Sequence, residues 1–277
     1  MKKLLQNRKI WYAVGSVLVI ALIFLISGTP AFVTTAAATK KLPIYSVQRD
    51  DKCVSLTFDA AWGNEDTQTL LSILARYNIR ATFFIVGSWA EKYPESVRAL
   101  AEAGHEVMNH SDTHPHMTQL SAEQMQAELR ACDDKVEALT GVRPILFRPP
   151  YGDYSDAVVA AARETGHYTI QWDVDSLDWK GISAAEITKR VLERAREGSV
   201  ILFHNAAEHT PEALPGIIEG LMREGYSFLP VSELIYREGY EVDHTGRQHP
   251  AAPAVRQSAP IVQAGKNLID QIGRAHV

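Results

Sequence analysis

The amino-acid sequence predicts one α/β domain whose strands form a parallel sheet closed into a seven-unit (β/α) barrel. Two observations support this fold class. Short apolar runs rich in β-branched and aromatic residues recur along residues 42–236, and amphipathic stretches separate them. Strands that alternate with helices form parallel sheets, and this many units favours a barrel. A doubly wound open sheet is the alternative. The 277 residues suffice for one sizeable domain but not for two large ones.

The apolar runs are bounded by turn residues, which makes each of them a candidate buried strand. The predicted strands are residues 54–59, 81–86, 106–110, 145–148, 169–174, 200–204 and 227–231.

The stretches between these runs carry helix start and stop signals. Ser121 and Gln124 form a capping-box pattern, and that stretch stops at Gly141. Another stretch starts at Pro94 and ends before Gly104, the usual start and stop pair. The predicted helices are residues 67–77, 94–103, 121–140, 155–165, 184–196 and 211–224.

The N-terminus has the pattern of an export signal. Four basic residues precede an uncharged apolar run over residues 10–26. This pattern is typical of a signal anchor or a signal peptide, which we assign to residues 1–28. The run is long for a signal-peptide core and short for a membrane span, so both alternatives stay open. Either one places the remaining chain outside the cytoplasm, in the cell membrane or secreted after cleavage.

Composition sets the remaining boundaries. Residues 29–49 have linker composition, residues 50–237 form the predicted catalytic domain, and residues 238–277 become rich in Ala and Pro, as in a disordered tail. The last six residues match a sequencing-library adapter in reverse translation, and we interpret them as an artefact. The net charge of −5 argues against nucleic-acid binding. Cys53 and Cys132 cannot define a disulfide framework, and two buried thiols are favoured over a bond.

Polar residues gather where the predicted strands end. In a parallel barrel the carboxyl ends of the strands form the rim on which active sites are built. The residues at these ends are Asp59, His110, Arg148, Asp173, Asp175 and His204. One such residue would carry little information, but their joint occurrence at five strand ends predicts an active site.

The third predicted strand runs into a pair of histidines. His110 and His114 are four residues apart, so on a helical turn they would share one face and could bind one metal ion. His116 is a third candidate ligand, and a polar loop with incidental histidines is the structural alternative. Asp59 could bind metal, act as a general base or cap a turn. Arg148 could hold a carboxylate by two hydrogen bonds, and His204 suits a general acid.

Five segments together resemble the ordered motifs of the polysaccharide deacetylases, the NodB-homology carbohydrate esterases. The resemblance covers about residues 50–236, and the order and spacing of the segments make it specific. It implies a distorted (β/α)7 barrel of the NodB-homology type. The segments are Thr57-Phe58-Asp59, His110-Ser111-Asp112-Thr113-His114, Arg148-Pro149-Pro150-Tyr151-Gly152, Asp175-Ser176-Leu177-Asp178-Trp179 and Leu202-Phe203-His204.

The resemblance also implies a role for each matched residue. His110 and His114 would bind a divalent metal, usually zinc and sometimes cobalt or another ion. Asp59 would be the general base and Arg148 would hold it. The backbone N–H of Tyr151 would stabilise the oxyanion. His204 would be the general acid with Asp175 tuning it, and Leu202 and Trp179 would line the pocket for the acetyl methyl group.

One position departs from the family pattern. The first motif usually has two consecutive aspartates, the second a metal ligand, but here Ala60 follows Asp59. This resembles a sporulation-type Gram-positive subgroup with a lone aspartate. Three protein ligands and a water are usual for catalytic zinc, so metal affinity should be lower unless another group fills the gap. The candidates are Asp59, Asp66, Asp112, His116 or an extra water.

These observations favour an enzyme that removes N-acetyl groups from a cell-wall polysaccharide, with N-acetylglucosamine or N-acetylmuramic acid of peptidoglycan as substrate. The alternative is a pseudo-enzyme that binds wall glycan without turnover, which Ala60 motivates. A cytoplasmic amidohydrolase of small cyclic amides is a third class, and the apolar run over residues 10–26 argues against it.

Overall fold

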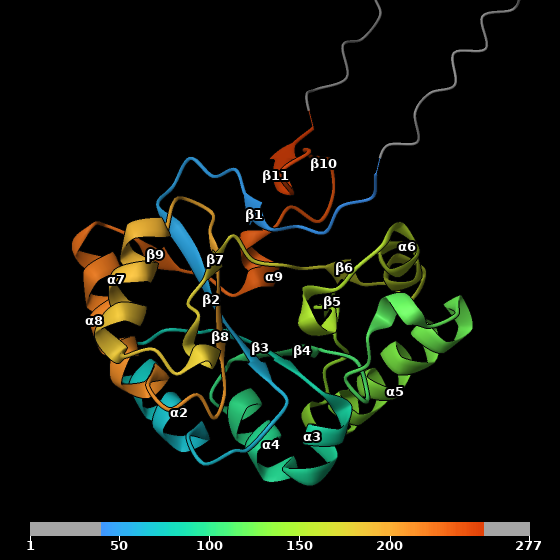
Figure 1. Cartoon of the computed structure of the whole chain (residues 1–277), viewed down its shortest axis with the longest axis horizontal. Coiled ribbons are helices and arrows are strands. Elements are labelled where there is room, and N and C mark those ends of the chain that lie inside the picture. Colours follow the sequence, from blue (N-terminus) through green and yellow to red (C-terminus); the bar gives the residue numbers. More distant parts are fainter. Residues whose placement is uncertain (1–39, 252–277) are drawn as a thin grey trace, which may run out of the picture. The chain divides into compact units, whose positions relative to one another are not determined.

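The computed structural model describes residues 40–251 (Figure 1). Residues 41–251 form one compact unit. Across residues 40–251 no helix has the length and apolar character needed to cross a membrane. The predicted signal segment, residues 1–28, and the end of the predicted tail lie outside the described residues.

A parallel sheet forms the centre of the unit. Within residues 40–251, seven strands are hydrogen-bonded in the order β6-β5-β4-β3-β2-β8-β7, and β9 pairs with β2 beside this path. All of these pairs are parallel. The strands are β2 Cys53–Ala60, β3 Thr82–Ile85, β4 Glu106–Asn109, β5 Leu146–Phe147, β6 Tyr168–Thr169, β7 Val174–Asp175, β8 Val200–His204 and β9 Ser227–Phe228.

The strand order is that of a barrel with one opening. Read as a ring, the strands follow the chain from β2 to β8 and return to β2, and β6 and β7 are the neighbours in this ring that do not pair. A doubly wound sheet would reverse direction at a switch point instead. The structure therefore confirms the seven-strand parallel α/β barrel in an incompletely closed form.

The opening lies inside the fifth predicted strand. Residues 169–174 were expected to form one strand, but the run divides into β6 and β7, which pair with β5 and β8. Between them the chain crosses the gap, and Gln171 N donates to Ile44 O (2.7 Å). The carboxylate of Asp173 accepts from Ser199 Oγ (2.8 Å) and Val200 N (2.9 Å), which fastens the crossing segment to β8. Burial raises the pKa of Asp173 to about 6.

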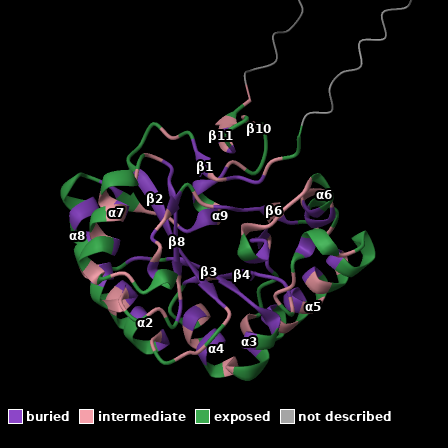
Figure 2. Cartoon of the chain, in the orientation of Figure 1, coloured by how far each residue is buried: buried purple, intermediate pink, exposed green. Residues whose placement is uncertain are grey.

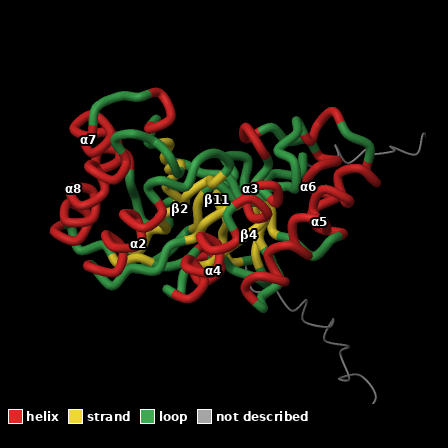
Figure 3. The backbone as a smooth tube through the Cα atoms, turned by 90° about the horizontal axis from the view of Figure 1, so that it is seen from below, coloured by secondary structure: helices red, strands yellow, loops and turns green. Residues whose placement is uncertain are grey.

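Helices surround the strands (Figure 3). The six predicted helices are present with ends within two residues of the prediction, while the short α3 and α9 were not predicted. Val231, expected to end a strand, instead begins α9 after Pro230. The helices are α2 Thr67–Arg76, α3 Gly87–Lys92, α4 Pro94–Glu102, α5 Ala122–Thr140, α6 Asp156–Glu164, α7 Ala184–Arg194, α8 Thr210–Arg223 and α9 Val231–Leu234. Their inward faces are buried and their outward faces exposed (Figure 2).

Alternation along β2 separates the core from the site. The side chains that pack into the main hydrophobic cluster come from every second residue of the strand, namely Val54, Leu56, Phe58 and Ala60. The ring of Phe58 stacks between Phe83 (centroids 4.8 Å apart) and Phe203 (5.4 Å). Thr57 and Asp59 hydrogen-bond on the opposite face of the strand. Because side chains alternate in a strand, Ala60 faces the core rather than the side on which Asp59 lies.

The ordered unit extends beyond both predicted boundaries. Strand β1 (Ser46–Val47) lies in the predicted linker, and β10 (Tyr240–Val242) and β11 (Arg247–Pro250) lie in the predicted tail; together they form a small three-stranded sheet. The composition of β11 is polar, so it carries no apolar signal, and it pairs with β1 through its backbone. As favoured by the sequence, Cys53 and Cys132 are buried free thiols.

Candidate active site

A buried ion pair forms the base of the site. Arg148 follows β5, is fully buried, and donates from Nη1 to Asp59 Oδ1 (2.7 Å) at the end of β2. The guanidinium also donates to Thr57 Oγ1 (2.9 Å) and to Gln171 O (3.1 Å). Burial by itself would raise the pKa of Asp59, but the positive charge of the adjacent Arg148 outweighs it and lowers that pKa below its usual value. Asp59 is therefore an ionised carboxylate at neutral pH.

His110 has a fixed tautomer. Its Nδ1 lies 2.7 Å from the carbonyl oxygen of Arg148, which can only accept a hydrogen bond, so Nδ1 carries the proton. Its Nε2 is then unprotonated and lies 3.6 Å from Asp59 Oδ2. Burial lowers the pKa of His110, which keeps the ring neutral. A backbone carbonyl that orients one ring nitrogen leaves the other nitrogen available as a metal ligand.

His114 is placed by a loop instead of the expected helical turn. Ser111 (φ 67°) and His114 (φ 61°) both adopt left-handed backbone conformations, which are uncommon for residues other than glycine. Ser111 Oγ accepts from His114 N (3.0 Å), and Glu128 of α5 accepts from the backbone N–H groups of Asp112 and Thr113. These bonds hold a conformation that would otherwise be unfavourable.

The loop brings the two histidine rings together. The ring centroids of His110 and His114 are 4.9 Å apart. Burial, with a smaller effect from nearby His110, lowers the pKa of His114 to about 4. Both rings are therefore neutral at physiological pH, the state in which histidine binds a metal ion.

A third protein ligand is not in place. Within residues 40–251, no group of three or more His, Cys, Asp or Glu side chains is arranged to hold a metal ion. The side chain of Asp112 is bonded to Lys135 Nζ (2.7 Å), and Asp66 Oδ2 accepts from Ala206 N (2.9 Å). His116 pairs with Asp153 (3.4 Å). Of the proposed substitutes, Asp59 is the one beside His110 (Nε2 to Oδ2, 3.6 Å), so the described residues offer a divalent ion two neutral nitrogens and no third ligand separate from Asp59.

Ala60 occupies the position at which the family usually has its acidic metal ligand. The residue is 1% exposed and packs in the main hydrophobic cluster. A carboxylate at this position would have to leave the core and turn over the end of β2 to approach the histidines. The sequence predicts one ligand too few, and the structure agrees, because the side chain at position 60 lies in the core and not beside the histidines.

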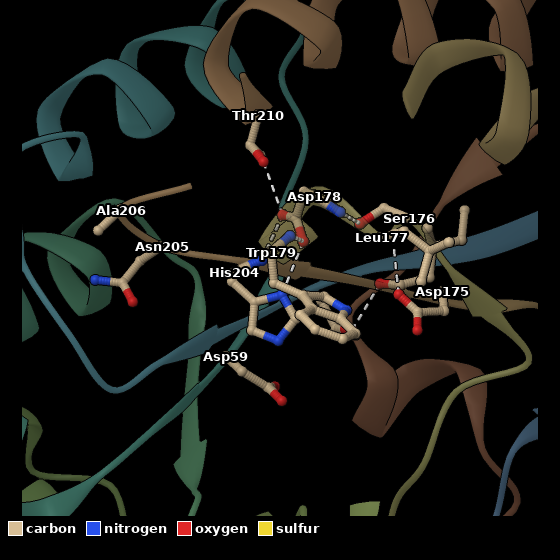
Figure 4. Close-up of polar contacts among 12 residues, drawn as sticks. Asp59, Asp175, Ser176, Leu177, Asp178, Trp179, His204, Asn205, Ala206 and Thr210 are labelled. Atoms are coloured by element: carbon tan, nitrogen blue, oxygen red, sulfur yellow. Dashed lines mark hydrogen bonds and ion pairs between the residues drawn. The ribbon is translucent and has the colours of Figure 1, made fainter. Parts of the chain in front are cut away.

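His204 is held by Asp178, not by Asp175. His204 Nδ1 lies 2.8 Å from Asp178 Oδ1, and Asp178 Oδ2 accepts from His204 N (2.8 Å) and Thr210 Oγ1 (2.7 Å) (Figure 4). Asp175 Oδ1 instead accepts from Leu177 N (2.8 Å). Burial would lower the pKa of His204, but the hydrogen bond and charge of Asp178 outweigh it, and the net pKa is raised.

Asp178 is a site residue that the sequence motif contains but does not distinguish from Asp175. Leu177 (φ 60°) has a left-handed conformation and precedes a short 3₁₀ turn, Asp178–Lys180. This turn places the Asp178 side chain, rather than that of Asp175, against the imidazole. A reading of the sequence offers two carboxylates three residues apart and no means to choose between them.

The other predicted site residues lie near these groups. Leu202 is buried on β8, two residues before His204 and therefore on the same face of the strand. Trp179 follows Asp178 and is exposed. Tyr151 has φ 60°, which is unfavourable for a bulky residue, and its ring centroid is 4.5 Å from that of His114. The strand register also sets Asp59 beside His204 across β2 and β8.

The sequence of the chain is similar to those of known deacetylases. A family model described as "Polysaccharide deacetylase" matches residues 46–170. A peptidoglycan-N-acetylglucosamine deacetylase of Bacillus cereus is 35% identical over 185 residues, covering 65% of this chain and 67% of that protein. The chain belongs to the polysaccharide deacetylase family.

Two other relatives in the family are longer than the matched part of this chain. YlxY of Bacillus subtilis, an uncharacterized protein, is 34% identical over 193 residues, covering 70% of this chain and 60% of YlxY. The peptidoglycan-N-acetylmuramic acid deacetylase PdaC of Bacillus subtilis is 35% identical over 189 residues, covering 68% of this chain and 40% of PdaC. The chain thus spans less than two thirds of the length of these two relatives.

Solved structures of the family include both inactive and active forms. BA3943 of Bacillus anthracis, described as a CE4 family pseudoenzyme, has a TM-score of 0.68 at 33% identity, covering 75% of this chain and 72% of that chain. A BA3943 mutant described as having restored enzymatic activity has a TM-score of 0.67 at 36% identity, covering 69% and 70%.

The partner of His204 can be tested with two matched substitutions. We expect Asp178→Asn to lower the pKa of His204, because a neutral amide no longer stabilises the imidazolium. Asp175→Asn is the control: it removes an equal charge that makes no contact with the ring, so its effect should be smaller. NMR titration of the His204 ring in both variants measures this. A larger fall in Asp175→Asn would assign the partner to Asp175.

Proposed function

We propose that the chain hydrolyses the N-acetyl groups of N-acetylglucosamine or N-acetylmuramic acid in peptidoglycan. The observation that carries this proposal is a pair of groups at the ends of adjacent strands whose pKa values are shifted in opposite directions. Asp59 is kept ionised by Arg148, and the pKa of His204 is raised by Asp178. Environments that push two titrating groups apart in this way are typical of an acid and base pair. The names of PdaC and of the Bacillus cereus relative support the sugar assignment.

The residues divide the reaction between them. Asp59 accepts a proton from the attacking water, whose oxygen forms a bond to the acetamide carbon. The backbone N–H of Tyr151 stabilises the developing oxyanion. His204 gives a proton to the nitrogen as the carbon–nitrogen bond breaks, so that acetate and the free amino sugar leave. Arg148 holds Asp59 in position throughout.

A divalent metal ion, zinc or cobalt by family resemblance, would be held by His110 and His114. When bound, such an ion acts as a Lewis acid toward the carbonyl oxygen and lowers the pKa of water. The two neutral nitrogens suit such an ion and the carboxylate of Asp59 lies beside them, whereas catalytic zinc usually has three protein ligands and a water.

A second candidate function is glycan binding without turnover. Ala60 faces the core, and the similarity to the pseudoenzyme BA3943 supports this alternative. Loss of metal affinity would leave the substrate-facing surface in place while lowering the rate. The two candidates differ in acetate release, which only the enzyme produces.

We also propose that the catalytic domain lies outside the cytoplasm, held at the cell membrane or released by signal cleavage. The basic residues and apolar run over residues 10–26 support this, as does a substrate located in the wall. A phosphatase reporter fused after residue 251, which is active only outside the cytoplasm, should be active. Activity of a cytoplasm-dependent reporter at the same position, with none from the phosphatase, would contradict this location.

Two substitutions separate the general acid from the metal site. We expect His204→Ala to reduce acetate release from peptidoglycan by about 10²- to 10⁴-fold, the usual contribution of a positioned acid. Zinc affinity should stay within about twofold, since His204 is bound to Asp178. His110→Ala should lose both properties. Isothermal titration with zinc and an acetate assay of the full chain measure them. Loss of zinc binding in His204→Ala would make His204 a ligand.

The missing ligand can be restored at position 60. We expect Ala60→Asp to tighten zinc binding at least tenfold, equivalent to about 1.4 kcal/mol, because it adds a charged oxygen donor. Without zinc the same variant should be less stable, by about 1–3 kcal/mol, because the carboxylate replaces a buried methyl group. Ala60→Asn is the matched control, since it adds the polar group without the charge.

Zinc titration and thermal unfolding of both variants, with and without zinc, measure the zinc affinity and the stability that this prediction concerns. Stabilisation of Ala60→Asp by zinc above that of Ala60→Asn supports a two-histidine site in the natural chain. Equal zinc affinity in the natural chain and Ala60→Asp would mean that Asp59 or water already completes the site.

A further inference from the structure

A cluster of buried polar side chains joins α5 to the loop that carries His114. We call Asn109, Asp133 and His167 the α5 cluster: they come from the end of β4, from α5 and from the residue before β6. Their exposed fractions are 0%, 1% and 5%. Buried polar groups are costly unless they are hydrogen-bonded, so the partners of each group indicate what the cluster does.

The side-chain amide of Asn109 has one favourable orientation. Its Nδ2 donates to Asp133 Oδ1 (2.7 Å) and to Leu129 O (2.8 Å), and its Oδ1 accepts from Ser111 N (2.8 Å). Carboxylate and carbonyl oxygens only accept hydrogen bonds, and a backbone N–H only donates one. A reversed amide would turn its oxygen toward two acceptors and its amino group toward a donor. The carboxylate of Asp133 therefore helps to set the direction in which Asn109 holds Ser111.

Ser111 passes this constraint on to His114. Its backbone is left-handed (φ 67°), and its Oγ accepts from His114 N (3.0 Å). Left-handed conformations of residues other than glycine cost free energy, and they persist where the surrounding structure holds them. The bond from Ser111 N to Asn109 is one of the contacts that hold this conformation, and it reaches α5 through Asp133.

Asp133 is itself held by two further groups. His167 Nε2 lies 3.0 Å from Asp133 Oδ1, and Arg143 Nη2 lies 3.5 Å from Asp133 Oδ2. The second ring nitrogen of His167, Nδ1, lies 3.0 Å from Thr165 Oγ1. These partners fix the carboxylate in place. Replacing buried charged groups with apolar ones is often neutral or stabilising, so stability alone explains Asp133 poorly.

We propose that Asp133 is a positioning residue for the candidate metal site. It orients the amide of Asn109, the amide holds Ser111, and Ser111 holds the backbone of His114. The ring of His114 is thereby kept beside that of His110 before an ion binds, and a preorganised site binds at a lower cost. The inference rests on the metal role proposed for the two histidines and extends the site to a carboxylate of α5.

Amide hydrogen exchange of the full chain, measured without metal, tests this role. Exchange at Ser111 N reports the loop, and exchange at Ser55 N, a buried amide of β2 that donates to Ser199 O (2.9 Å), reports overall unfolding. We expect Asp133→Ala to raise the rate at Ser111 relative to Ser55 by about threefold to tenfold, because the amide of Asn109 loses an acceptor. Asp133→Asn keeps an uncharged oxygen acceptor, so its rise should be smaller, about twofold.

Asp134→Ala is the matched control. Asp134 is the next residue of α5 and also pairs with Arg143 (2.9 Å), but its side chain is 70% exposed. This variant should leave exchange at Ser111 and zinc affinity unchanged. Titration with zinc gives the second measurement: the affinity should fall about threefold to tenfold in Asp133→Ala, and Asp133→Asn should recover most of this loss.

The comparison of Ser111 with Ser55 separates positioning from stability. A purely structural role of Asp133 would raise both exchange rates by the same factor, and that result would overturn the inference. If Asp133→Ala does not fold, the ratio in Asp133→Asn is compared with that in Asp134→Ala, and equal ratios overturn it. Unchanged zinc affinity in Asp133→Ala, when the natural chain binds zinc, would do the same.

The exchange measurement is independent of the proposed function, because it uses neither metal nor substrate. A chain that releases acetate from peptidoglycan while the Asp133 variants leave Ser111 exchange unchanged supports the enzyme and contradicts the positioning role. A chain whose Ser111 exchange rises as expected but which neither binds zinc nor releases acetate supports the hold of Asp133 on the loop and contradicts the enzyme.

Discussion

The rest of the site depends on the buried charge of Arg148. A fully buried guanidinium is costly unless it is paired and hydrogen-bonded, and here its partners come from two parts of the barrel. It donates to Asp59 and Thr57 of β2 and to Gln171 of the crossing segment, and its own carbonyl orients His110. One residue thus holds the carboxylate of Asp59, the tautomer of His110 and the backbone that spans the opening between β6 and β7.

The sequence predicted the site residues that end strands, because a polar residue that terminates an apolar run must lie at the rim of a parallel barrel. Asp59, His110 and His204 were found in this way. It could not choose Asp178 over Asp175, since a left-handed Leu177 decides which carboxylate meets the imidazole. It also missed the loop conformation of His114, which is held by a hydroxyl and by Glu128 of a distant helix. The polar strand β11 is held by backbone pairing and by side-chain hydrogen bonds such as those of Gln248 to the backbone of Tyr236, so it carries no apolar pattern and its composition suggested a tail.

The alternation of side chains along β2 explains why the candidate metal site has two histidines and no adjacent second aspartate. Asp59 and Thr57 face Arg148, while Phe58 and Ala60 face the helices. A second acidic residue after Asp59 would begin on the core side and reach the histidines only over the end of the strand. With alanine there, the strand end packs as core, and the metal site is left with two neutral nitrogens. Alanine at this position therefore belongs to the core and supplies no oxygen ligand beside the two histidines.

The two candidate functions make different demands on the chain. Glycan binding needs a surface that contacts the sugar, such as the exposed rings of Trp62 and Tyr151. It does not need an ionised carboxylate held by a buried arginine, nor an imidazole whose pKa an aspartate raises. Replacing a buried ion pair with apolar groups is often neutral or stabilising, so the pair between Asp59 and Arg148 is poorly explained by stability alone. Hydrolysis uses both groups, and this favours the enzyme over the binding protein even with an incomplete set of metal ligands.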